Sequence, residues 1–268
     1  MESTTSRTPY LLSNAGAEAP ARLTALSAMF DPGTIRHLED RGIGPGWHCL
    51  EVGGGGGSIA GWLAARVGDS GYVLATDVDP RFLRSLDLPN VEVCCHDVAR
   101  DPLPESAFDI VHVRLVLNCL PEPAAAIARL RTALKPGGWL VCEEFDSESM
   151  PPDPAVNGGE LLLRTQVAIG RLLANRGFDR RLGRRLFALL RAGGFDDVGA
   201  EARVFMVQGG SPGADLIRAN CQQLRCALIE AGDLNGGAID EDLRRLNDPQ
   251  LIMPSSIMWT AWGRRIAA

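Results

Sequence analysis

One short stretch decides the fold of this chain: Leu50-Glu51-Val52-Gly53-Gly54-Gly55-Gly56-Gly57-Ser58. The residues before the glycines close an apolar strand from Cys49 to Val52, and a helical pattern of apolar residues follows from Ile59 to Val67. Ser58 is placed to cap that helix. The glycines therefore lie at the carboxyl edge of a sheet, where open α/β sheets bind ligands and a backbone without Cβ atoms allows close approach.

Short apolar runs continue to alternate with helical patterns from about Trp47 to Val141, which is typical of a parallel sheet built from βαβ units. We predict an α/β fold: a doubly wound, mostly parallel seven-stranded sheet with an antiparallel last strand and helical cap insertions. The last two strands are expected to pair as a hairpin interrupted by an insertion. The predicted strands are residues 49–52, 72–76, 91–95, 110–113, 139–142, 200–207 and 257–262.

Length and composition favour one domain with additions. The chain has 268 residues, of which 46% are hydrophobic, enough for a substantial core. We expect an N-terminal helical lid at residues 1–45 and an α/β domain at residues 46–268, with helical insertions near residues 155–177 and 212–235.

Charge and patterning restrict the partners. A net charge of -6 argues against a protein that neutralises many phosphates, so no nucleic acid is expected. No membrane-length apolar segment or targeting sequence is visible, and the seven cysteines form no CxxC pair or metal site. We expect a cytoplasmic protein with no membrane partner and a small-molecule substrate, and take a homodimer as the default assembly.

The spacing of the glycines separates three ligand types. A dinucleotide site has glycine at positions one, three and six, but the sixth residue from Gly53 is Ser58. A P-loop needs Gly-Lys-Ser/Thr, and the only lysine, Lys135, lies far downstream. The pattern Glu51-x-Gly53-x-Gly55-x-Gly57 is better suited to a ligand with an ammonium and a sulfonium group, because the acid would repel a pyrophosphate.

With this pattern the chain resembles the class I, Rossmann-like S-adenosylmethionine-dependent methyltransferases. Further motifs follow in the order of that family: Asp77 ends the second strand, Cys95-His96-Asp97-Val98 ends the third, and the fourth and fifth motifs span residues 108–121 and 134–141. The resemblance is close from about Leu50 to Asp146.

The resemblance implies a cofactor and a role for each motif. Asp77 would accept both ribose hydroxyls, Val78 would lie against adenine, Asp97 would meet the adenine amino group, and Arg114 and Leu115 would touch the methionine part through their backbone. The implied cofactor is S-adenosyl-L-methionine, held by Glu51, Gly53, Gly55, Gly57, Asp77, Val78, Asp97, Val98, Arg114 and Leu115.

The predicted function is methyl transfer to a small molecule, with natural products among the candidates, by in-line displacement that requires alignment rather than a covalent nucleophile. No catalytic residue is assigned; Asn118, Cys119 and Glu144 are pocket candidates, and Cys119 stands where many similar enzymes have histidine. His112 is expected to be a core residue. Two alternatives remain: a nicotinamide oxidoreductase, although the chain lacks a Tyr-x-x-x-Lys pair, and a protein of the methyltransferase fold that binds the cofactor without methylating.

Overall fold

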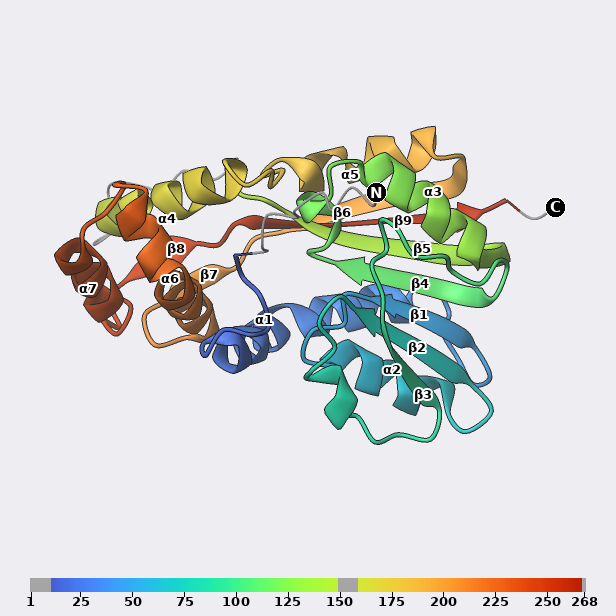
Figure 1. Ribbon diagram of the computed structural model, residues 1–268. Helices are drawn as coiled ribbons and strands as arrows, with labels where there is room; N and C mark the ends of the chain where they lie inside the picture. The colour runs from blue at the N-terminus through green and yellow to red at the C-terminus, as the bar shows by residue number, and fades with distance from the viewer. Residues whose placement is uncertain (1–10, 149–158, 267–268) are drawn as a thin grey trace, which may run out of the picture.

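The computed structural model describes residues 11–148 and 159–266, and only the backbone of residues 159–163. The first ten residues of the predicted lid and the start of the predicted insertion near 155–177 lie outside these ranges. The described chain forms a twisted sheet with helices on both faces and, beside it, a cluster of helices with a two-stranded ladder (Figure 1).

The main sheet has seven strands in the order β3-β2-β1-β4-β5-β9-β6. The first five pair in parallel, and β9 pairs antiparallel with both β5 and β6. The predicted fold class is therefore confirmed, including the antiparallel last strand. The strands are β1 (His48–Val52), β2 (Tyr72–Asp77), β3 (Val91–Cys95), β4 (Phe108–Arg114), β5 (Leu134–Asp146), β6 (Phe195–Arg203) and β9 (Ile257–Arg265).

Each face of the sheet is covered by two helices, as a parallel sheet requires. Helices α3 (Pro123–Ala133) and α5 (Leu182–Ala192) bury leucines against one face, and α1 (Ala19–Glu39) and α2 (Ser58–Val67) cover the other. Alternate residues of β1 belong to the two layers: Leu50 packs on the α3 side, and Cys49 on the α2 side. Glu51 shares the face of Cys49, so its carboxylate points toward α1 and α2.

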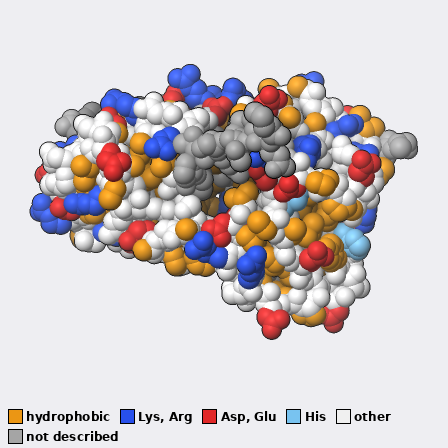
Figure 2. All heavy atoms as spheres, viewed as in Figure 1, with side chains coloured by type: hydrophobic (Ala, Val, Ile, Leu, Met, Phe, Trp, Pro, Cys, Tyr) orange, Lys and Arg blue, Asp and Glu red, His pale blue; other side chains and the backbone are white. Residues whose placement is uncertain are grey.

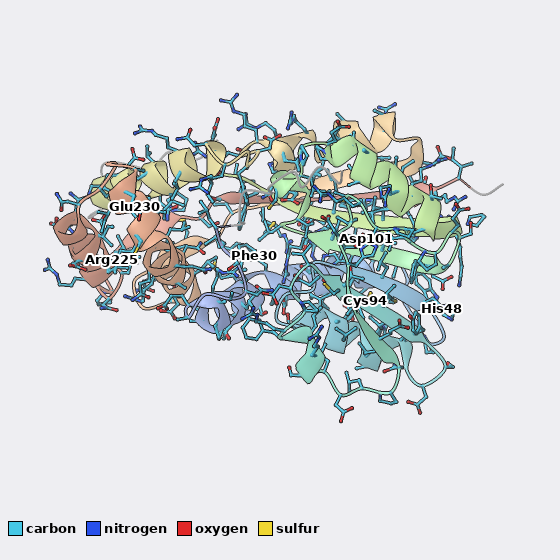
Figure 3. All side chains as sticks on the ribbon, in the orientation of Figure 1. Phe30, His48, Cys94, Asp101, Arg225 and Glu230 are labelled. Carbon is cyan, nitrogen blue, oxygen red and sulfur yellow. The ribbon has the colours of Figure 1, made fainter. Side chains whose placement is uncertain are left out.

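The helices beside the sheet form the cap. They are α4 (Gly159–Ala174), α6 (Pro212–Glu230) and α7 (Gly236–Arg245), together with the ladder β7 (Met206–Gln208) and β8 (Ile252–Pro254). Arg225 and Glu230 lie at the outer end of the cap, and Phe30 of α1 lies where the cap meets the sheet (Figure 3). Phe30 is buried with Leu216 of α6 and Met258 of β9, so α1 joins the two parts.

Two local predictions are wrong. The segment 200–207 is two strands, because β6 ends at Arg203 and β7 joins the cap ladder. Ser58 does not cap α2: the N-cap residue is Gly57, at φ +83°, and the Ser58 hydroxyl shares a 2.9 Å hydrogen bond with Ser27 of α1. The Ser58 hydroxyl thus connects α1 and α2 and does not accept from the free N–H groups in the first turn of α2.

Acidic and basic side chains are interspersed over the face of the molecule shown in Figure 2. Within residues 11–148 and 159–266, no helix combines the length and the apolar composition that crossing a bilayer requires.

Candidate active site

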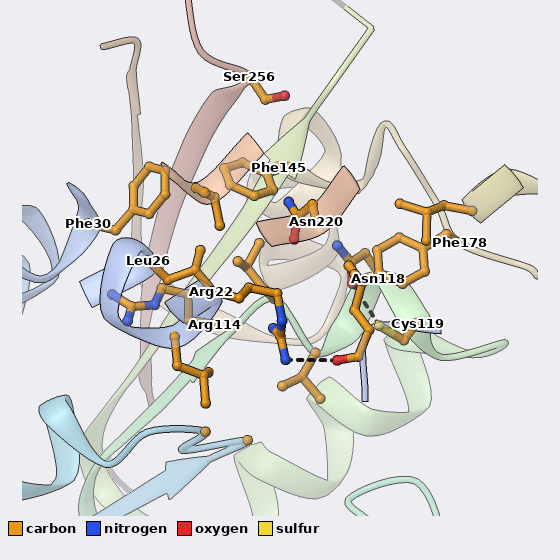
Figure 4. A pocket seen from close by; sticks show the side chains of 18 of the residues that line it. Arg22, Leu26, Phe30, Arg114, Asn118, Cys119, Phe145, Phe178, Asn220 and Ser256 are labelled. Atoms are coloured by element: carbon orange, nitrogen blue, oxygen red, sulfur yellow. Dashed lines mark hydrogen bonds between the residues drawn. The ribbon is translucent and has the colours of Figure 1, made fainter. Parts of the chain in front are cut away.

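A cavity of about 550 Å³ lies between the carboxyl edge of the sheet and the cap. Its floor is made by the ends of β1, β2, β4 and β5, and its walls by faces of α1, α4 and α6. The volume falls in the range of small-molecule sites. Figure 4 shows part of the lining, with side chains from both the sheet and the helices directed at one space.

The glycine turn forms one end of this cavity. Gly53 has φ +69°, and a Cβ there would lie 2.2 Å from Val116 Cγ2, so a side chain at this position would strain the backbone and displace Val116. Gly55 also lines the cavity, and its N–H donates to Asp77 Oδ2 at 3.0 Å. Gly57 is not among the lining residues; it starts α2 and packs toward Leu86.

The predicted ribose and adenine residues line the same end. Asp77 is buried, and its Oδ1 accepts the Asp79 N–H at 2.9 Å. Burial raises the pKa of Asp77, and the N–H donors of Asp79 and Gly55 oppose that shift. Val78 is 49% exposed although apolar, and it lines the cavity together with Asp97 and the buried Val98. Two valines and an acid thus line this end of the cavity.

The end of β4 brings Arg114 and Leu115 to the cavity. The Arg114 guanidinium turns to α1, where it donates to Asp31 Oδ1 at 2.8 Å and to Thr34 Oγ1 at 2.9 Å. Leu115 has φ +57°, rare for a branched side chain, and its N–H donates to the Glu143 carbonyl. The strained backbone directs the chain over the cavity floor.

The three predicted pocket residues separate. Asn118 and Cys119 line the cavity, and Cys119 Sγ lies 3.1 Å from Asn118 Oδ1. Glu144 does not line it. Its Oε1 accepts the N–H groups of Val116, Leu117 and Asn118 at 2.7–3.4 Å, and burial raises its pKa to about 8 against those donors. Glu144 therefore shapes the turn that carries Asn118.

Glu51 lines the floor of the cavity and pairs with His112, which the sequence predicts to be a core residue. His112 lies beside it on β4, and its Nδ1 is 2.7 Å from Glu51 Oε2. His112 Nε2 is 3.3 Å from Glu143 Oε2. Burial would lower the pKa of His112, but the two carboxylates raise it to about 9, so the ring is a cation that donates from both nitrogens. No described residue donates to Glu51 Oε1.

The comparisons with known proteins agree with this geometry. Residues 50–142 match the family described as "Methyltransferase domain". Residues 50–142 therefore carry a methyltransferase domain, in agreement with the family that the sequence motifs resemble. The matched segment runs from β1 to β5 and contains the glycine turn and every predicted cofactor residue.

Curated relatives match the methyltransferase domain and its surroundings. The ubiquinone/menaquinone biosynthesis C-methyltransferase UbiE of Bordetella avium is 36% identical over 122 residues, 42% of this chain and 46% of that protein. Methyltransferase str2 of Strobilurus tenacellus is 33% identical over 141 residues, 52% of this chain and 50% of that protein. The chain spans about half the length of the curated relatives it matches.

Solved structures share the fold at low identity. Phosphoethanolamine N-methyltransferase 2 of Haemonchus contortus, in complex with phosphomonomethylethanolamine and S-adenosylhomocysteine, aligns at a TM-score of 0.58 and 14% identity over 94% of this chain and 58% of that one. The YcgJ protein of Bacillus subtilis aligns at a TM-score of 0.55 and 13% identity over 87% and 97%.

Behind the cofactor end of the methyltransferase domain, the charge network continues to α1. Glu143 is fully buried; its Oε1 accepts from Arg203 at 2.7 Å and from Thr260 at 2.6 Å, and its Oε2 accepts from Thr34 of α1. Burial would raise the pKa of Glu143, but the hydrogen bond and charge of His112 lower it to about 2. One charged layer thus joins Glu51 to the helix above it.

The far walls of the cavity hold residues that sequence reasoning did not single out. Phe30, Phe145 and Phe178 line it, with the Phe30 and Phe145 rings packed edge to face at 5.4 Å. Asn220 of α6 also lines it, and its Oδ1 is buried without a hydrogen-bond partner. In the sequence, Asn220 could have been noticed as a polar residue in an apolar helical stripe. No sequence pattern showed that this stripe faces the site.

Proposed function

We propose that this protein transfers a methyl group from S-adenosylmethionine to a small molecule that binds between the sheet and the cap. The observation that carries the proposal is that one cavity contains both the glycine turn with Glu51, Asp77 and Asp97 and a separate wall of aromatic side chains. A binding protein for a nucleoside alone needs only the first part. Two ligands side by side are what group transfer requires.

The residues at the cofactor end fit S-adenosylmethionine. Glu51 Oε1 is available to an ammonium group, the Asp77 carboxylate to ribose hydroxyls, and the space beside Val78 and Val98 to adenine. S-adenosylmethionine supplies an electrophilic methyl group on a sulfonium. The chain positions both partners and excludes water, and no base is assigned.

Three observations support a small acceptor. The cavity is enclosed on its far side by α4 and α6, the net charge is negative, and the curated relatives include proteins named for C-methylation in ubiquinone and menaquinone biosynthesis.

We propose that residues 1–45 form a lid, because α1 lines the cavity while Asp31 and Thr34 bind the end of β4. The regions 155–177 and 212–235 remain the proposed cap insertions.

Cofactor binding is tested by calorimetry with S-adenosylhomocysteine. The wild-type protein should bind it, and Asp77→Asn should weaken binding at least tenfold, because the neutral amide replaces a carboxylate that accepts from both hydroxyls. Asp87→Asn is the matched control, since Asp87 is exposed and does not line the cavity. No affinity for the nucleoside together with tight binding of a nicotinamide dinucleotide would refute the proposal.

Methyl transfer is tested with radiolabelled S-adenosylmethionine and a cell extract separated by dialysis. Label from the methyl group should appear in a dialysable compound that chromatography separates from S-adenosylmethionine, with S-adenosylhomocysteine accumulating in equal amount. Label in retained RNA or protein would contradict the small-molecule acceptor. Binding of the cofactor without any product would favour the non-methylating alternative.

A further inference from the structure

We propose that the acceptor is an uncharged, mainly apolar compound whose hydroxyl group is bound by Asn220, with Asn118 as a second hydrogen-bonding residue. That this ligand is the methyl acceptor rests on the methyl transfer proposed above. That the cavity binds such a ligand follows from the side chains of the far wall alone.

The position of Asn220 on its helix is the first step. Four residues of α6 line the cavity, Gly213, Leu216, Ile217 and Asn220, at the spacing of one helical face. Three of them are apolar or lack a side chain. Asn220 is the exception, and its Oδ1 is buried with no partner among the described residues. Leaving a buried amide oxygen without a hydrogen bond is unfavourable, and a ligand with a matching donor removes that cost.

Asn118 supplies a second carboxamide to the same cavity. Its side chain is buried, and its Oδ1 faces Cys119 Sγ, while no described residue accepts from its Nδ2. Figure 4 shows both amides among the lining side chains, with the ring of Phe178 beside Asn118. A hydroxyl group both donates and accepts, so it satisfies a carboxamide whichever of its two ends is turned inward.

The charges around these amides indicate a neutral ligand. On the acceptor side, three charged lining residues have an ion partner: Asp146 pairs with Arg184, Asp179 with Arg185, and Arg180 with Glu148. The guanidinium of Arg22, on α1, is held by the Leu12 carbonyl and by the side-chain oxygens of Asn14 and Gln223. A charged acceptor would therefore lose its hydration without gaining a counter-ion of its own.

The remaining wall sets the size and shape of the ligand. Phe30, Phe145 and Phe178 offer ring faces and edges, and Leu26, Leu115 and Ile217 fill the spaces between them. Aromatic walls favour flat apolar groups. A ring compound that carries one or two hydroxyl groups matches both the wall and the amides.

Three probes of similar size test the inference: 2-naphthol, 2-methylnaphthalene and 2-naphthoate, measured by equilibrium dialysis with saturating S-adenosylhomocysteine. We expect wild-type protein to bind 2-naphthol about tenfold more tightly than 2-methylnaphthalene, and 2-naphthoate most weakly. Asn220→Leu should remove the preference for the naphthol and leave the affinity for methylnaphthalene within about twofold, because the two side chains have similar shape. Asn118→Leu should reduce the preference in part.

The control variant is Asn175→Leu, at an exposed position that does not line the cavity; it should keep the naphthol preference. Equal binding of naphthol and methylnaphthalene to the wild type, a preference that survives in Asn220→Leu, or tightest binding of naphthoate would each overturn the inference. Calorimetry with S-adenosylhomocysteine on the same samples separates this failure from failure of the proposed function. Asn220→Leu should bind the nucleoside like the wild type.

Discussion

At the scale of single residues, the cofactor end of the cavity depends on close contacts that leave little space for a larger side chain. Gly53 sits against Val116, and the next turn carries Leu115 in a left-handed conformation. These two backbones approach each other at the ends of β1 and β4, where the methionine part of the cofactor is proposed to bind. Close packing at Gly53 and Leu115, together with the Glu51 carboxylate, forms this part of the site.

We predict that Gly53→Ala weakens binding of S-adenosylhomocysteine more than tenfold, because the added methyl group would lie 2.2 Å from Val116 Cγ2. Gly68→Ala is the matched control. Gly68 also has positive φ, at +66°, but an added Cβ would meet no atom within 4 Å. Both variants should lose stability, because Gly53 has positive φ and Gly68, at φ +66° and ψ −171°, lies in a region essentially restricted to glycine. Only Gly53→Ala should lose affinity in calorimetry. Equal affinities would mean that Val116 moves aside freely.

At the scale of elements, α1 is the part that joins site, sheet and cap. Its Gly33 lies over Arg203, whose guanidinium donates to Glu143. Alanine is the better helix former by about 1 kcal/mol, yet a Cβ at position 33 would lie 0.9 Å from Arg203 Nη1. The helix therefore gives up intrinsic stability so that it can lie close to the charged layer.

We predict that Gly33→Ala lowers the free energy of unfolding by about 1–3 kcal/mol through displacement of Arg203. Gly61→Ala, in the interior of α2, should be neutral or stabilising, because its nearest neighbour would be Leu86 Cδ2 at 3.8 Å. Urea denaturation of both variants measures the difference. A stabilised Gly33→Ala protein would show that α1 is held loosely.

The sequence was sufficient for some elements and not for others. The strands from β1 to β4 could be predicted closely because each is a short apolar run followed by a turn or acid. The helix α7 was missed, although Asn235 caps it by accepting from the Ala238 N–H. The charged layer could not be foreseen, because Glu51 and His112 are 61 residues apart and meet only through strand register.

At the scale of the whole molecule, the charged layer makes stability depend on pH. The pKa of His112 is raised to about 9 from 6.5, so its contribution is complete below about pH 6.5 and is lost as the pH rises through about 9. The pKa of Glu144 is also raised, to about 8 from 4.5, so the contribution of Glu144 to stability likewise decreases as the pH rises from about 4.5 to 8. The lowered pKa of Glu143, about 2, acts only in acid, where its contribution is lost as the pH falls below about 4.5.

We predict that the free energy of unfolding of the wild type decreases from pH 6.5 to pH 9, and that His112→Gln makes this decrease smaller. At pH 6.5 the variant should be less stable by about 3 kcal/mol, because it leaves Glu51 and Glu143 without the cation between them. His48→Gln is the control, since His48 is exposed. Urea titrations at both pH values provide the data, and parallel pH profiles for wild type and His112→Gln would contradict the prediction.

The place of β9 has a consequence for how this protein is made. Its residues Ile257–Arg265 enter between β5 and β6, two strands that end more than fifty residues earlier in the chain. While the polypeptide emerges from the ribosome, β6 has no neighbour and the outer edge of β5 stays bare until that segment arrives. A nascent chain halted before Ile257 would thus present open strand edges to its surroundings, the condition in which chaperone binding or aggregation competes with folding.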